Sequence, residues 1–135
     1  MSVIARSEER ATRQSSRQQI IITANLPYLT PKQFNSSPSI QHEPKLALIA
    51  GADGLKYYRK LLTQIHQLLE IGNWKLEIFL EIDPSQSKSI TSLIKSILPA
   101  VDVQIIKDLS GLDRVVKIIT WNQSPKNHQE VIFIM

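Results

Sequence analysis

Cysteine is absent from this 135-residue chain, and glycine is scarce, with only four residues. Without cysteine, the chain has no disulfide framework, no thiolate metal site and no cysteine nucleophile. Its glycine content is about half the usual share of roughly 7%. No two glycines are spaced as G-x-G, so the chain contains no glycine-rich cradle for a phosphate or a dinucleotide. The four are Gly51, Gly54, Gly72 and Gly111.

Histidines and long apolar runs are also few. The three histidines, His42, His66 and His128, lie far apart in the chain and have different neighbours, so we expect no bound metal. No apolar run approaches the roughly 18 residues of a membrane-spanning helix, and no apolar signal-peptide segment follows the N-terminus. The sequence therefore predicts a cytoplasmic location and no membrane partner.

The charge distribution does not indicate a nucleic-acid partner. The net charge is +4, and the hydrophobic and charged fractions of 42% and 21% are those of an ordinary globular protein. The basic residues are scattered and form no Lys/Arg block interleaved with aromatic residues. We therefore expect a globular domain, and we do not expect it to bind nucleic acid.

Two changes in composition divide the chain. Residues 1–17 contain four arginines and two glutamates but no sustained apolar stripe, so we expect an irregular leader. Residues 122–135 are polar until a short apolar end, and we expect a C-terminal tail there. This places the folded domain at residues 18–121.

Within that domain, the apolar residues change between strand-like and helix-like spacing. We predict strands at 18–25, 74–82, 101–105 and 115–121, and helices at 55–71 and 83–98, with a loop at 29–41. Alternation of strands and helices predicts an α/β fold with a mostly parallel sheet. The tight turn near Gly111 makes the last of these strands antiparallel. The isoleucine run of the first strand predicts burial on both faces, although two helices cover a parallel sheet only poorly.

The segment Asn25-Leu26-Pro27-Tyr28 stands at the end of the first strand, where α/β sheets bind their ligands. Pro27 ends the strand, so the carbonyls of Leu26 and Pro27 are not consumed by a following ladder. The amide of Asn25 and these carbonyls can accept the two protons of a planar NH2 group, while the Tyr28 ring packs on its plane. Such a hold orients the nitrogen for attack. The same four residues could equally form only a turn.

This segment and the residues downstream of it resemble a known family. ANLPY after an isoleucine-rich strand resembles the N-[PL]-P-Y motif of S-adenosylmethionine-dependent amino methyltransferases. Over roughly residues 18–119, the chain is similar to the release-factor-specific protein-(glutamine-N5) methyltransferases. The matching segments are Glu43-Pro44 through Leu46-Ala47-Leu48, Gly51-Ala52-Asp53-Gly54-Leu55 with Tyr58-Arg59, Leu80-Glu81-Ile82 with Gln86, and Asp108 to Val115.

The resemblance implies a role for each residue of the motif. Asn25 would hold the glutamine side-chain amide and lie next to the methyl group of S-adenosylmethionine, so it is the candidate catalytic and cofactor-binding residue. Leu26 and Pro27 would contribute backbone carbonyls, and Tyr28 would pack on the substrate amide. Leu26 stands where the glutamine branch more often has proline, and leucine is the common choice in the rRNA adenine branch. Asp83-Pro84 replaces the family's usual glycine.

The resemblance also implies that part of the family's architecture is missing. The complete enzyme has a seven-stranded Rossmann-like class I sheet, and this chain would supply only its last four strands. The family's acidic G-x-G turn lies upstream of N-x-P-Y. We therefore expect a truncated chain that is inactive alone and binds S-adenosylmethionine weakly or not at all.

The expected protein partner is a peptide chain release factor, together with a complementing N-terminal half or a second copy that covers the apolar side of the first strand. Two alternatives stay open. One is an N6-adenine methyltransferase of rRNA or DNA. The other is a non-enzymatic fragment or one half of a split enzyme.

Several other polar residues are expected to have structural roles. Asp53 is expected to cap the helix that starts near Leu55. Glu77 and Glu81 lie on one strand face, and we expect them to be solvated or ion-paired rather than a hydrolase's carboxylate pair. The charged residues of 108–114 are expected to form a turn with a local ion pair. We expect His66 to be structural.

Overall fold

The computed structural model describes residues 19–72, 74–121 and 129–134. The expected leader, residues 1–17, therefore lies outside the described residues. The elements in chain order are β1 (Gln19–Ala24), α2 (Pro31–Ser36), η1 (Pro38–Ile40), α3 (Lys45–Leu48), α4 (Lys56–Ile71), β2 (Lys75–Glu81), η2 (Pro84–Gln86), α5 (Ser87–Ile97), β3 (Asp102–Lys107), β4 (Asp113–Ile119) and β5 (Gln129–Ile134). Four strands and two long helices occur where the sequence predicts them.

The strands form one five-stranded sheet in the order β3-β4-β2-β1-β5. β1 is parallel to both β2 and β5, whereas β4 is antiparallel to both β2 and β3. The prediction of an α/β fold with a mostly parallel sheet and an antiparallel 115–121 strand is confirmed. Gly111, at φ 80°, forms the turn between β3 and β4, because that left-handed conformation is open to glycine.

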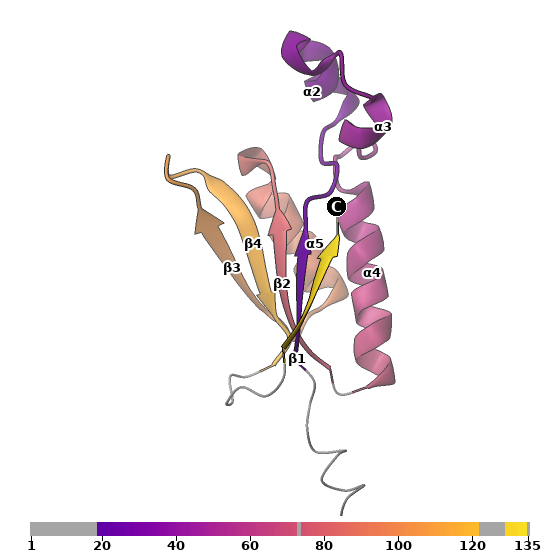
Figure 1. Cartoon of the computed structure of the whole chain (residues 1–135), viewed down its shortest axis with the longest axis vertical. Coiled ribbons are helices and arrows are strands. Elements are labelled where there is room, and N and C mark those ends of the chain that lie inside the picture. The colour runs from indigo at the N-terminus through magenta and orange to yellow at the C-terminus, as the bar shows by residue number, and fades with distance from the viewer. Residues whose placement is uncertain (1–18, 73, 122–128, 135) are drawn as a thin grey trace, which may run out of the picture.

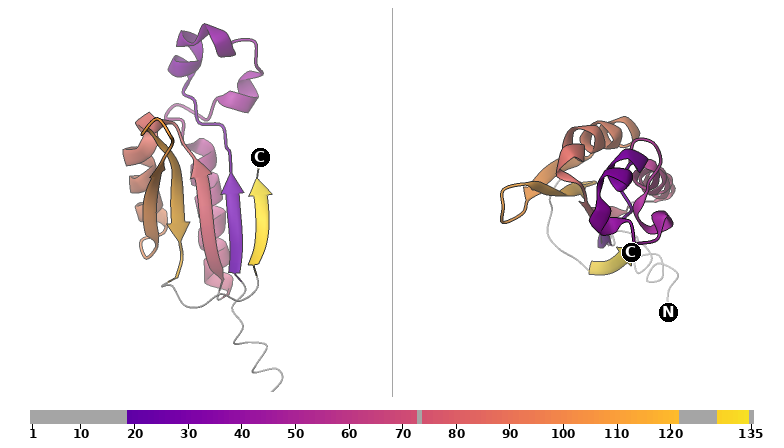
Figure 2. Two further views of the ribbon diagram at one scale, coloured as in Figure 1. Left: turned by 60° about the vertical axis from the view of Figure 1, so that its left-hand side comes forward. Right: turned by 90° about the horizontal axis from the view of Figure 1, so that it is seen from above.

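Helices α4 and α5 pack side by side on the same side of the sheet (Figures 1 and 2). Their apolar stripes and the alternate residues of the strands form the core. We call the strand residues on this side the covered face. These residues are Ile20, Ile22, Leu76, Ile78, Leu80, Val116 and Ile118, and all are buried.

The opposite side of the sheet, which we call the open face, carries Ile21, Thr23, Phe79, Val115 and Phe133. Among the described residues, no helix covers it (Figure 2). Ile21 and Thr23 are only half-buried. The prediction that the first strand is buried on both faces is therefore wrong, because both crossover helices pack on one side.

The predicted loop at 29–41 contains helical turns. α2 begins after a capping box, in which the Thr30 hydroxyl accepts from the Gln33 backbone and the Gln33 side chain accepts from the Thr30 backbone. The apolar stretch at residues 46–50 contributes to the short helix α3. These turns lie beyond the carboxyl end of β1 (Figure 1).

The C-terminal segment, expected as a tail, contributes a strand. β5 pairs in parallel with β1 over six residue pairs, from Gln19↔Gln129 to Ala24↔Ile134. β1 thereby has a neighbour on both sides. The physical reason is that an apolar, β-prone segment and an unpaired strand edge satisfy each other's backbone groups.

Candidate amide-binding site

The candidate site lies where the carboxyl ends of β1, β2 and β5 meet. Asn25 is the first residue after β1, and its backbone N–H donates to the carbonyl of Ile134 at 3.2 Å. Ile20, Ile22 and Ala24 face the helices, so by alternation Asn25 lies on the open-face side. Asn25 is exposed, so its side-chain amide is accessible to a ligand.

Asn25 borders a cavity of about 230 Å³ on the open face. The lining residues are Thr23, Ala24, Asn25, Phe79, Glu81, Val115, Phe133 and Ile134. They come from β1, β2, β4 and β5, so the sheet itself forms the floor. The cavity combines apolar walls with an amide and a carboxylate at one end, which suits a polar group on an apolar stem.

The backbone after Asn25 leaves acceptors available. Among the hydrogen bonds of the described residues, none is accepted by the carbonyl of Leu26 or Pro27. The next carbonyl, that of Tyr28, accepts from Gln86 Nε2 at 2.9 Å. The structure thus supports the sequence argument that the first two carbonyls are not consumed by a ladder.

Tyr28 is partly buried and packs against the core. Burial, and after it the carboxylates of Glu81 and Asp83, raise the pKa of the Tyr28 phenol above its usual value, against an opposing effect of Arg114. The phenol therefore stays neutral at physiological pH. Tyr28 can supply a ring face and a hydroxyl, but it is not a general base.

Gln86 and Gly54 hold the Asn25–Tyr28 segment in place. Gln86 is buried, and its Nε2 also donates to the Gly54 carbonyl at 3.4 Å while its Oε1 accepts from the Asp83 N–H at 3.2 Å. Gly54 has φ +73°, and a Cβ there would clash with the Tyr28 carbonyl oxygen. Only glycine fits this position. Both residues belong to the segments that carry the family resemblance, but the sequence alone assigned them no positioning role.

The other singled-out carboxylates have local structural partners. Asp53 accepts from the Leu55 backbone at 3.0 Å and from Arg59 at 2.8 Å. These bonds, in that order, lower the pKa of Asp53. The N-cap residue of α4 is Leu55, so the prediction that Asp53 caps this helix is wrong. The Asp53 carboxylate instead accepts from the backbone N–H of that N-cap residue and pairs with Arg59. Glu77 pairs with Lys117 at 2.7 Å, as the ion-paired alternative predicts.

The turn between β3 and β4 is held by Asp108. Its Oδ1 accepts from the backbones of Ser110 and Leu112 at 2.9 and 3.0 Å, and Arg114 pairs with its Oδ2 at 3.2 Å. Lys107 and Asp113 form a second pair at 2.6 Å. The prediction of a turn with a local ion pair is confirmed.

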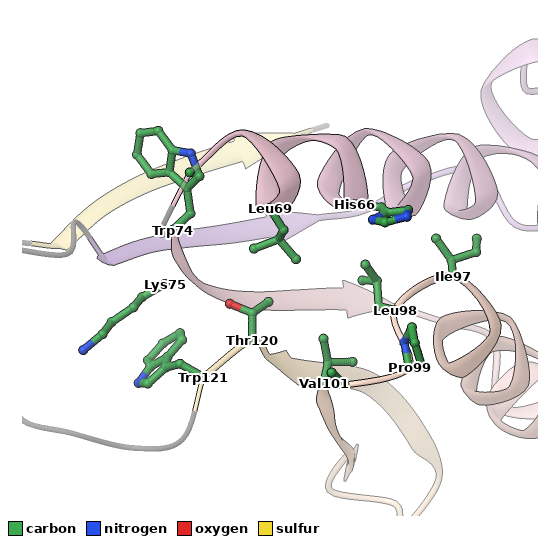
Figure 3. A pocket seen from close by; sticks show the side chains of 12 residues that line it. His66, Leu69, Trp74, Lys75, Ile97, Leu98, Pro99, Val101, Thr120 and Trp121 are labelled. Atoms are coloured by element: carbon green, nitrogen blue, oxygen red, sulfur yellow. The ribbon is translucent and has the colours of Figure 1, made fainter.

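A larger cavity of about 370 Å³ lies at the amino end of β2, away from Asn25 (Figure 3). Trp74, Trp121, Leu98 and Val101 line it, and His66, from α4, lies at its edge. His66 is half-exposed and lies 3.7 Å from Glu70, one helical turn away. This cavity contains no residue of the Asn25–Tyr28 segment. The smaller cavity, unlike this one, lies at the carboxyl ends of the strands, where α/β sheets bind their ligands.

Within the described residues, no group of three histidine, aspartate or glutamate side chains is placed to hold a metal ion. None of the described helices is both long enough and apolar enough to cross a membrane.

Sequence reasoning missed Phe133 and Ile134, which border the candidate cavity. They lie in the segment for which the sequence predicts a tail. The signal that could have identified them is the run Val131 to Ile134, whose β-branched and aromatic residues favour a strand.

No family model matches the chain. The chain is similar to proteins named release factor glutamine methyltransferase. It is 31% identical over 98 residues to the one from Bacillus anthracis, covering 71% of this chain and 34% of the relative. It is 36% identical over 98 residues to the one from Caulobacter vibrioides, covering 71% of this chain and 32% of the relative. The chain thus spans about a third of the length of these curated relatives.

A solved structure, the release-factor-specific protein-(glutamine-N5) methyltransferase from Alicyclobacillus acidocaldarius, matches with a TM-score of 0.33 and 17% identity, covering 82% of this chain and 87% of that chain. This match is too distant to add to the argument. The sequence relatives confirm the resemblance found in the motifs.

Proposed function

We propose that this chain, a homologue of release factor glutamine methyltransferases over about a third of their length, carries the part of such an enzyme that binds the glutamine amide. The reaction of that enzyme would transfer a methyl group from S-adenosylmethionine to the side-chain nitrogen of a glutamine in a peptide chain release factor. Since release factors act in translation, we propose a cytoplasmic location.

The observation that carries this proposal is the arrangement after β1. Asn25 borders a cavity of about 230 Å³, and the next two carbonyls accept no hydrogen bond among the described residues. A primary amide has two N–H protons in one plane. One can bond Asn25 Oδ1 and the other the Leu26 carbonyl, while Tyr28 packs against the plane.

This hold would orient the amide nitrogen rather than deprotonate it. With both protons fixed in the amide plane, the nitrogen's π electrons point out of that plane, toward one side of the site. No general base is needed before attack, because the proton can leave after the new N–C bond has formed. The raised pKa of Tyr28 is consistent with this, since the phenol stays neutral and contributes packing.

The described residues do not fit the whole methyl donor. The cavity, at about 230 Å³, is smaller than the roughly 300–1,000 Å³ of typical ligand pockets. The left-handed glycine Gly54 lies against Tyr28 and Gln86, where even an added Cβ would clash, so this turn is not an open glycine cradle. We infer that residues outside the described part, or a partner polypeptide, would supply most of the donor site.

A polypeptide that carries the complementary N-terminal half would meet this need. A second copy of this chain would cover the open face, but it would not supply the missing donor residues. The half-buried Ile21 and the exposed Phe133 on that face support an interaction there. A strictly monomeric chain in analytical ultracentrifugation would contradict self-association.

Asn25→Ala tests the amide site directly. We expect N-acetylglutamine methylamide to shift the backbone resonances of residues 23–28 in a nitrogen-15 NMR titration, and Asn25→Ala to weaken this binding about tenfold through the lost hydrogen bonds. Asn35→Ala, at another exposed asparagine, is the matched control and should bind as the native chain does. Equal binding by Asn25→Ala would overturn the proposal.

The donor is tested by isothermal titration of the chain with S-adenosylmethionine. We expect binding weaker than micromolar, because the described residues build only part of a donor site. Micromolar binding would show that the chain contains a complete one.

The second candidate function is N6-adenine methylation of nucleic acid. Leu26, the common choice in the rRNA adenine branch, is the observation that favours it. Offering release factor and rRNA side by side to the chain and its complementing partner separates the two. Methylation of neither would favour a non-enzymatic fragment.

A further inference from the structure

β5 contributes directly to the structure of the candidate site. It pairs with the full length of β1, and its Ile134 carbonyl accepts the backbone N–H of Asn25 at 3.2 Å. That hydrogen bond closes the β1–β5 ladder, directly before the Leu26 and Pro27 carbonyls that are free to accept from a ligand. The position of the Asn25 backbone therefore depends on β5 as well as on β2.

β5 also supplies a side chain to the cavity. Thr23 lies in register with Phe79 on β2 and with Phe133 on β5. A small residue thus stands between two aromatic residues, and both rings border the cavity next to Asn25. Residues on one strand face repeat every two positions, so the row of Thr23 lies about 6.7 Å from Asn25 along the strand.

The Phe133 side chain is not part of the hydrophobic core. Phe133 is 72% exposed, whereas its neighbour Ile132, which lies on the other face of the same strand, is 40% exposed. A large aromatic side chain at the wall of a cavity gains stability when an apolar group packs on it. The ring is therefore available to contact a ligand in the cavity.

We propose that β5 forms part of the amide-binding site. Ile134 is a positioning residue that fixes the Asn25 backbone, and Phe133 is a specificity residue whose ring, with that of Phe79, packs on the methylenes that carry the amide. The substrate class is a primary amide on an extended aliphatic stem, which selects glutamine over asparagine. This inference rests on the proposed function, because it assumes that an amide binds at Asn25.

The placement of β5 also limits how a partner can bind. Because β5 occupies the edge of β1, a complementing polypeptide that adds a strand must pair with the outer edge of β5 or displace it. The chain therefore builds this side of the amide site itself.

The first experiment titrates the native chain, Phe133→Ala and Ile132→Ala with N-acetylglutamine methylamide and with N-acetylasparagine methylamide, followed by NMR. We expect the native chain to prefer the glutamine probe and Phe133→Ala to lose about fivefold to tenfold in affinity for it, the worth of one to two methylenes. Ile132→Ala, on the other face of the same strand, should bind as the native chain does. Equal binding by Phe133→Ala, or no preference for glutamine, would overturn the specificity role.

The second experiment measures backbone hydrogen exchange and needs no ligand. We expect the backbone N–H of Asn25 to be protected from exchange in the full chain. In a chain that ends at His128, the Asn25 N–H should lose this protection, whereas the backbone N–H of Ile78 should stay protected. An unprotected Asn25 in the full chain would overturn the positioning role, and this result stands even where the shortened chain fails to fold. If neither probe binds the native chain, the proposed function and the role of Phe133 fail together, but the exchange result still decides the role of Ile134.

Discussion

The two faces of the sheet are built by the same strands, yet they differ in burial. On β2, Leu76, Ile78 and Leu80 point to the helices and are fully buried. Their immediate neighbours point the other way and are only half-buried, among them Phe79 and Glu81. The covered face holds the fold together, whereas the open face carries the cavity and the side chain of Asn25.

This difference shows how one strand can serve stability and binding at once. Successive side chains point to opposite faces, so a substitution at one position leaves the other face's contacts in place. Stability and ligand binding should therefore respond to different residues of the same strand.

The largest difference in the free energy of unfolding is expected between substitutions at two adjacent residues of β2. Ile78→Ala removes a fully buried side chain from the covered face and should lower the free energy of unfolding by about 3 kcal/mol. Phe79→Ala removes a half-buried ring from the open face, with Lys117 Nζ 5.5 Å above it, and should cost about 1 kcal/mol. Urea unfolding of both variants measures the difference. Equal losses would show that something covers the open face in solution.

A smaller loss of stability is expected at Gln86, which anchors the segment that follows the carboxyl end of β1. Gln86→Leu removes the donor to the Tyr28 carbonyl and should cost about 1–3 kcal/mol, because that partly buried carbonyl and the Asp83 N–H lose their partner. It should also weaken binding of N-acetylglutamine methylamide, since the segment after Asn25 loses its anchor. Gln67→Leu, at an exposed position of α4, is the control. Unchanged stability and binding in Gln86→Leu would show that this anchor is dispensable.

The smallest effect is expected at the exposed β3–β4 turn and depends on pH. Backbone hydrogen bonding from Leu112, then the bonds from Arg114 and Ser110, lower the pKa of Asp108. A carboxylate with a lowered pKa contributes stability that is fully present above its unfolded pKa of about 3.9 and is lost as the pH falls through the folded value. The turn should therefore loosen below about pH 4.

Hydrogen exchange of the β3–β4 amides between neutral and acidic pH measures this loss. Asp108→Asn should show the looser turn already at neutral pH and little further change in acid. A turn that exchanges equally at both pH values in the native chain would contradict the role given to Asp108.

Local features are predicted well by the sequence. The alternation of Leu76, Ile78, Leu80 and Ile82 predicts a strand with one buried face, and all four are fully buried. Asp83 before Pro84 predicts a helix start, and Asp83 forms a capping box there with Gln86. These predictions succeed because periodicity and capping depend on residues within a few positions of each other.

The predictions from the sequence that fail mostly concern contacts between segments that are distant in the chain. The apolar character of β1 indicates burial but not which face is covered. The tail gives no sign of its partner, because β5 pairs with residues more than 100 positions earlier in the chain. The loop at 29–41 is a local exception, since its proline, serine and asparagine content does not reveal that Thr30 and Gln33 complete a capping box.

The sequence by itself therefore determined the α/β class, the strands and helices of the core, and the Asn25–Tyr28 segment as the candidate for amide binding. Only the tertiary structure decided that both helices cover one face and that β5 joins the edge of β1 next to Asn25. The physical reason is that strand pairing uses backbone groups that every residue carries. The partner of an edge strand is then decided by which unpaired edge the folded chain brings within reach.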